Sequence, residues 1–133
     1  MRVQRVLAVA VFALIFTMLG GLVSAHHSVQ GYDRKKTITM KGVVAEWRWR
    51  NPHAFLVWDV KDASGKVVQW TGELQSPLSM VAAGLSRSTF KAGDEVTVTG
   101  YPASKGTPQS IIQKVVNADG KVMIDRGNTA LEP

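Results

Sequence analysis

The sequence predicts an all-β fold, a small antiparallel, five-stranded, OB-like Greek-key barrel with one short helix between strands three and four. Apolar and polar residues alternate through most segments from residue 37 to residue 117, which is the period of half-buried strands. The segments follow the order three strands, one helix and two strands, and the first strand is long enough to bend around a barrel. A sandwich of two sheets is the alternative, but a closed barrel leaves so small a sheet without exposed edges.

The strand boundaries follow from turn residues. In the first strand the alternation changes parity after Gly42, which predicts a β-bulge at that glycine, and Asn51-Pro52 ends the strand. The second, third and fifth strands are expected over residues 54–60, 66–74 and 110–117, and the fourth begins after Asp94. The valines expected in the core are Val43, Val57, Val96 and Val98.

The helix is expected near residues 77–84. Ser76 is a suitable N-cap, Pro77 is favoured at the first helical position, and Gly84 can end the helix. A stripe of apolar residues on one face is typical of a helix that packs on a core. The residues of this stripe are Leu78, Val81, Ala82 and Leu85.

Residues 1–25 have the three-part layout of a secretory signal peptide. Arg2 and Arg5 precede an uncharged apolar run over residues 6–19, and small residues precede a cleavage site after Ala25. Because the run is shorter than the roughly 20 residues that span a bilayer, we expect cleavage and a periplasmic or secreted protein. Retention as an N-terminal membrane anchor is the alternative. The mature chain would consist of an extended arm over residues 26–36, the barrel domain over residues 37–125 and a frayed tail over residues 126–133.

Composition narrows the possible functions. The chain has no cysteine, which excludes disulfides, thiolate metal ligands and a cysteine nucleophile. The formal net charge is +6, and the basic residues are scattered apart from the cluster Arg34-Lys35-Lys36, so a solvated surface is favoured over an acidic ligand or a membrane surface. Export argues against a nucleic-acid partner and leaves a periplasmic protein or a small ligand. No phosphate-binding glycine motif or defensible catalytic pair is present, so a binding module is favoured over an enzyme.

Three histidines, His26, His27 and His53, are candidate metal ligands. The predicted cleavage gives His26 a free α-amine, which closes a chelate ring with Nδ1 of its own imidazole. His53 lies in the predicted turn between the first two strands and adds a third nitrogen if the arm folds back along the barrel. Three nitrogens in a plane suit Cu(II), and Zn(II) accepts the same set with a fourth ligand, for which Asp33 and Glu73 are the nearest carboxylates. The alternative is that these histidines have structural or incidental roles.

Four tryptophans form a second candidate site. Trp47, Trp58 and Trp70 are expected in the core, because an indole ring buries a large area. Trp49 is expected to keep a partly exposed ring on the strand face with which OB-folds bind ligands. The further candidates for this ligand face are Arg48, Arg50, Asn51 and Glu73. The alternative function is therefore a metal-free module that binds a partner protein or a small ligand on its aromatic face.

Five short motifs stand out along the mature chain. They are His26-His27-Ser28, Tyr32-Asp33, Trp49-x-Asn51-Pro52-His53, Trp70-x-x-Glu73 and the glycine–valine run from Lys91 to Gly100. Together they resemble a family of small exported bacterial proteins of unknown function, over nearly all of the mature chain. The resemblance implies an exported domain and assigns no activity. The chain departs from the family pattern at Tyr32, where the family keeps phenylalanine, and at Leu85, where the family tends to have tryptophan.

Overall fold

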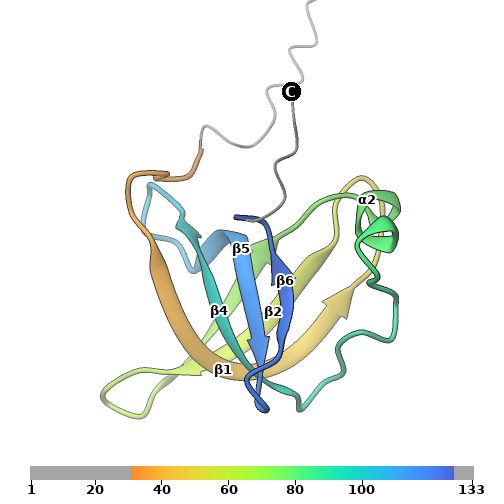
Figure 1. Ribbon diagram of the computed structural model, residues 1–133. Helices are drawn as coiled ribbons and strands as arrows, with labels where there is room; N and C mark the ends of the chain where they lie inside the picture. Colours follow the sequence, from red (N-terminus) through yellow and green to blue (C-terminus); the bar gives the residue numbers. More distant parts are fainter. Residues whose placement is uncertain (1–30, 128–133) are drawn as a thin grey trace, which may run out of the picture.

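The computed structural model describes residues 31–127. This part of the chain contains six strands and one short helix (Figure 1). In chain order they are β1 (Ile38–Arg48), β2 (Phe55–Lys61), β3 (Val67–Glu73), α2 (Pro77–Ala82), β4 (Glu95–Pro102), β5 (Gln109–Asn117) and β6 (Val122–Asp125). The predicted signal peptide, His26, His27 and the last six residues lie outside the described part.

The strands close into a barrel, which confirms the predicted fold class. Antiparallel pairing links them in the order β3-β2-β1-β4-β5-β6, and β3 also pairs with β5 to close a five-stranded barrel. The closing pair is parallel, whereas we expected antiparallel pairing throughout, because β3 and β5 run in the same direction with β4 returning between them. β6 is an additional strand, paired with β5, that the alternation up to residue 117 does not predict.

The bulge in β1 lies further along the strand than predicted. Val44 and Glu46 lie opposite consecutive residues of β2, so the register shifts between them, whereas Gly42 keeps regular pairing with β4. The alternation therefore runs unbroken from Ile38 to Val44, and Val44 is buried while Val43 is 42% exposed. The predicted burial of Val43 is wrong, because the parity changes after that residue rather than before it.

Gly42 is required by a close approach between strands rather than by a bulge. A Cβ at Gly42 would overlap the carbonyl oxygen of Asp59 and would lie 2.8 Å from Cδ1 of Trp58. Trp58 is fully buried and stacks on the half-buried Trp70, with ring centroids 6.2 Å apart. The glycine therefore makes room for the indole that fills the barrel interior.

The core follows the alternation of β4, whereas β2 and β5 each bury three consecutive residues. The predictions that Val57, Val96 and Val98 are buried are confirmed, with exposed fractions of 2%, 1% and 1%. Trp47 is half-buried at the edge of this core, where its Nε1 donates to the carbonyl of Ser86 at 3.0 Å. The other large side chains that are fully buried are Val44, Leu56, Trp58, Ile112 and Val115.

The helix α2 is shorter than expected and buries a different face. Ser76 caps it as predicted, since its Oγ accepts a backbone N–H at 3.4 Å. Met80 packs into the core, whereas Leu78 and Val81 are 82% and 57% exposed. Of the expected apolar stripe, Leu85 is buried in the core as predicted, whereas Leu78, Val81 and Ala82 are exposed. Met80, roughly half a turn round from Leu78, makes the core contact of the helix instead. Within residues 31–127 no helix is long and apolar enough to cross a membrane.

One end of the barrel gathers segments that are distant in the sequence. Figure 1 shows the chain entering there at residue 31, together with the β1–β2 connection, the end of β3, α2 and the end of β6. The candidate metal ligand His53 lies in the β1–β2 connection, so this end contains the site described next.

Candidate functional site

Backbone pairing places His53 beside the end of β3. The residue follows Asn51 and Pro52, which a cis peptide bond joins, and precedes β2. The neighbouring Ala54 donates its N–H to the carbonyl of Gln75 at 3.0 Å and accepts from the N–H of Leu74 at 2.9 Å. The β1–β2 connection is thereby paired with the residues that follow β3.

The imidazole of His53 is oriented by two acceptors. Its Nδ1 lies 2.9 Å from Oε1 of Glu73 and 3.0 Å from the carbonyl oxygen of Leu74. Because both partners are acceptors, Nδ1 carries the proton, and in the neutral ring Nε2 keeps its lone pair. The side chain of Glu73 is 15% exposed and that of His53 is 40% exposed, so the ring reaches from a sheltered carboxylate towards solvent.

The negative charge of Glu73 affects the pKa of other groups at this end of the barrel. Burial and the negative charge of Glu73 raise the pKa of Tyr32. Burial lowers the pKa of the Arg126 guanidinium, and so does the charge of Arg34, while Glu73 and Tyr101 act in the opposite direction. Glu73 therefore contacts a histidine, and its charge also acts on a tyrosine and an arginine from two other segments of the chain.

The segment after the predicted arm is bound at the same end. Tyr32 forms a bridge with Ala103, and the N–H of Asp33 donates to the carbonyl of Pro102 at 2.9 Å. His27 precedes Gly31 by four residues, a span of at most about 14 Å for extended chain. The chain thus enters the structure at the end of the barrel that contains the β1–β2 connection, and His26 and His27 lie outside the described residues.

The two carboxylates suggested as further ligands differ in their surroundings. Oδ1 of Asp33 accepts the N–H of Lys35 at 3.0 Å and is exposed to solvent. Glu73 instead bonds the imidazole of His53 and would act as an outer partner that orients a metal-ligating ring. Residues 31–127 contain no group of three His, Asp or Glu side chains able to hold a metal ion.

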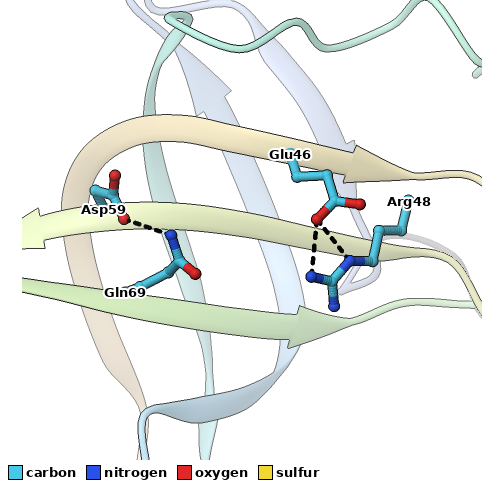
Figure 2. Close-up of polar contacts among 4 residues, drawn as sticks. All are labelled: Glu46, Arg48, Asp59 and Gln69. Atoms are coloured by element: carbon cyan, nitrogen blue, oxygen red, sulfur yellow. Dashed lines mark hydrogen bonds and ion pairs between the residues drawn. The ribbon is translucent and has the colours of Figure 1, made fainter.

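On the candidate ligand face, the side chain of Arg48 is paired with its neighbour Glu46 in β1. Figure 2 shows Arg48 bound to Glu46, with Nη2 2.7 Å and Nε 2.8 Å from Oε2. This pairing raises the pKa of Arg48 and lowers that of Glu46. The figure also shows Asp59 accepting from Nε2 of Gln69 at 3.0 Å, which links β2 to β3.

Aromatic contacts complete the description of this face. Trp49 is half-buried, and its ring lies 5.5 Å from that of Trp47, so the prediction of a partly exposed ring agrees with the structure. The guanidinium of Arg50 lies 5.7 Å from the ring centroid of Phe55 in a cation–π contact, and Asn51 is exposed. Arg50 and Asn51 are therefore the exposed members of the face, and Trp49 is partly accessible beside them.

Arg126 is the site residue that sequence reasoning missed. Of the tail predicted over residues 126–133, the structure describes the first two residues, and Arg126 is half-buried. Its N–H donates to the carbonyl of Gln113 at 2.8 Å, and Nη1 donates to the carbonyl of Ile112 at 3.3 Å. The alternation of Val122 and Ile124 was the available signal for β6, the strand that positions Arg126.

A comparison with protein families shows to which family the chain belongs. A model described as a family of unknown function, DUF6152, matches residues 15–112, which is most of the chain. The chain belongs to this family. No curated protein and no solved structure gives a significant match. Membership of DUF6152 agrees with the resemblance to an uncharacterised family and leaves the function to be argued from the site itself.

Proposed function

We propose that this DUF6152 protein is an exported module that binds Cu(II), with Zn(II) as a second metal that the same donors accept. The ligands are the α-amine and Nδ1 of His26, at the mature N-terminus, and Nε2 of His53. His27 lies next to this chelate. The observation that carries the proposal is the contact of His53 Nδ1 with Glu73 and with the carbonyl of Leu74.

The contact of His53 with Glu73 supports the proposal through the tautomer that it selects. A metal-ligating histidine almost always donates its other ring N–H to a carboxylate or a backbone carbonyl, which orients the ring and makes the ligating nitrogen more basic. Nδ1 of His53 has both kinds of partner at 2.9 and 3.0 Å. The ring is therefore prepared to bind a cation through Nε2 before any metal arrives.

The donor chemistry favours Cu(II) over other metals. Cysteine is absent from the chain, and the methionines of residues 31–127 lie in the core (Met80) or pack against it (Met40 and Met123), so the donors proposed here are nitrogens rather than soft sulfur. One amine and two imidazoles match the tetragonal preference of Cu(II). Zn(II) would complete a tetrahedron with a water molecule.

The decisive experiment compares two N-termini of the same protein. The mature chain beginning at His26 and a form extended by one residue are titrated with Cu(II) and followed by electron paramagnetic resonance. The extension keeps every side chain but removes the chelate, so affinity should fall sharply, as it should in His53→Ala. His27→Ala is the matched control and should weaken binding less. Equal affinity of the native and extended forms rejects the proposed chelate.

Export is tested separately by the mass of the intact protein recovered from the periplasm or the medium. The proposal requires a chain that starts at His26. A mass that still contains residues 1–25 would mean that the α-amine of His26 is blocked, and the chelate would then be impossible.

A metal-free binding module is the second candidate, favoured by the accessible Arg50–Phe55 pair and the half-buried ring of Trp49. Here the aromatic face, with Arg48, Arg50, Asn51 and Glu73, holds a partner protein or a small ligand. The two candidates differ in their mutational pattern. Histidine changes abolish function in the first and leave it intact in the second, whereas Trp49→Ala does the reverse.

A further inference from the structure

The two most exposed large apolar side chains within residues 31–127 lie on α2. Leu78 is 82% exposed and Val81 is 57% exposed, and Ala82 is exposed as well. Residues three and four positions apart share one face of a helix, so these three form a single apolar stripe. The sequence predicted that they pack on the core, but Met80 makes that contact and the stripe faces solvent.

The end of β1 and the β1–β2 connection lie beside α2. Nε1 of Trp47 donates to the carbonyl of Ser86, four residues after the helix, and the N–H of Ala54 donates to the carbonyl of Gln75, just before it. The ring of Trp49 lies 5.5 Å from that of Trp47 and is half-buried. A partly accessible indole therefore lies at the corner of the barrel that carries the apolar stripe.

The charge of this corner is positive. Arg50 follows Trp49 directly, Arg87 follows Ser86 directly, and both are exposed. Residues 74–93, which include α2, contain two cations and no carboxylate. Glu46, the one carboxylate of β1, is paired with Arg48. Basic residues that are scattered in the sequence are thus brought beside exposed apolar side chains by the fold.

We propose that this corner, formed by Leu78, Val81, Trp49, Arg50 and Arg87, binds the surface of a membrane that contains anionic lipids. Aliphatic side chains enter the boundary between headgroups and acyl chains, an indole lies at the headgroup level, and guanidinium groups bond lipid phosphates. A fluid lipid surface accepts a projecting side chain without a complementary groove, which suits a leucine that is 82% exposed. Binding is peripheral, because α2 has six residues and a bilayer span needs roughly 20.

The entry point of the chain agrees with this orientation. Residue 31 enters the structure at the end of the barrel that carries α2 (Figure 1). Residues 20–30 separate it from the apolar run over residues 6–19, a span of at most about 40 Å of extended chain. If that run were retained as an anchor, it would hold α2 within reach of the same bilayer. After cleavage the corner acts alone, and its binding is reversible.

Flotation with lipid vesicles tests the corner on the mature chain beginning at His26, in the presence of a metal chelator. This chain keeps all six strands of the barrel and lacks residues 6–19, which would bind lipid by themselves. It should bind phosphatidylglycerol vesicles saturably, less at high salt, and phosphatidylcholine vesicles much more weakly. Leu78→Ser with Val81→Ser should lower the partition coefficient by about tenfold or more, because two aliphatic side chains no longer leave water.

Val67→Ser with Val122→Ser is the matched control. These valines are 52% and 45% exposed, at the starts of β3 and β6, which lie at the opposite end of the barrel (Figure 1). This double variant should bind within about twofold of wild type. Arg50→Gln with Arg87→Gln should weaken binding to phosphatidylglycerol by about fivefold for each charge removed.

The proposal is overturned if the wild-type chain does not bind phosphatidylglycerol vesicles, if it binds phosphatidylcholine equally well, or if the two serine double variants behave alike. Thermal unfolding checks that these variants, which alter exposed side chains, remain folded. Sedimentation without lipid tests a different occupant: a dimer that dissociates in the Leu78→Ser, Val81→Ser variant would assign the corner to a second copy of the chain. Because metal is excluded throughout, none of these outcomes bears on the copper site.

Discussion

The imidazole of His53 is fixed by the carboxylate of Glu73, 20 residues further along the chain, with Nδ1 2.9 Å from Oε1. Glu73 is the last residue of β3 and His53 lies just before β2, so the contact joins two segments that the β2–β3 hairpin brings side by side. The same contact orients a histidine whose Nε2 can accept a metal ion. The following predictions test this relationship and the packing that supports it.

Replacing Glu73 by glutamine should weaken Cu(II) binding about 10–100-fold, the usual cost of losing an outer partner of a metal-ligating histidine. The amide still fills the site but no longer supplies a full negative charge to His53. Competition titration against a copper chelator measures the change. Glu95→Gln, which alters an exposed carboxylate paired with Lys41 on the barrel wall, is the control and should leave the affinity unchanged.

Copper affinity should fall steeply as the pH drops from about 8 to 5 if the chelate forms. An α-amine has an ordinary pKa of about 7.7–8.0 and must lose its proton to bind a metal. Each proton displaced then costs about tenfold in affinity for every pH unit below the pKa. Titrations at several pH values should therefore give a shallower slope for the form extended by one residue. Identical slopes for the two N-termini contradict an amine ligand.

Tyr32 should ionise at higher pH than an exposed tyrosine, because burial and the charge of Glu73 both raise its pKa. The folded state then favours the neutral ring, so this stabilisation is complete below the ordinary pKa of about 10 and is lost as the pH rises through the folded pKa. Tyr101→Phe removes the other tyrosine, so the absorbance of tyrosinate reports Tyr32 alone. Adding Glu73→Gln should shift that titration to lower pH. No shift would place Glu73 too far away to act on the ring.

Gly42→Ala should destabilise the barrel by about 1–3 kcal/mol, the typical cost of overpacking. The added methyl group would overlap the carbonyl of Asp59 and press on Trp58, which has no room to move. Urea unfolding measures the loss. Gly31→Ala is the matched control, because a Cβ there meets nothing within 4 Å. Equal stability of the two variants would mean that β1 can shift away from β2 at no cost.

Local alternation predicted the strands well, and long-range register could not be predicted. Val96 and Val98 of β4 alternate with polar residues, and β2 is apolar on nearly both faces, so the burial of Val57, Val96 and Val98 is predicted correctly. The parity of β1 depends on where the bulge pairs with β2, a property of two strands together, and Val43 was therefore misplaced.

In the candidate site, too, individual residues could be predicted from the sequence, whereas contacts between distant segments could not. His53 and Glu73 were both identified as candidate ligands, because histidines and carboxylates are few enough to consider one by one. Their contact was not predicted, since it follows from the pairing of Ala54 with Leu74 and Gln75. Arg126 was overlooked because β6 is a short strand with a weak pattern, and its burial arises only when β6 pairs with β5.

The parallel closure of the barrel has a dynamic consequence. It consists of three residue pairs, Thr71 with Gln109, Gly72 with Ser110 and Glu73 with Ile111, so β3 and β5 meet along a short seam. Short junctions of this kind are where local opening occurs and where amide hydrogens exchange fastest. Glu73 belongs to this seam, so a ligand bound beside it would bind only when β3 and β5 are paired. At a ligand concentration of 100 times the Kd, the free energy needed to open the seam would rise by about 2.7 kcal/mol. A ligand bound at this end of the barrel would therefore make the separation of β3 from β5 rarer. Slower exchange of the amide hydrogens along β3 and β5 would then show that the site is occupied, even if the ligand is unidentified.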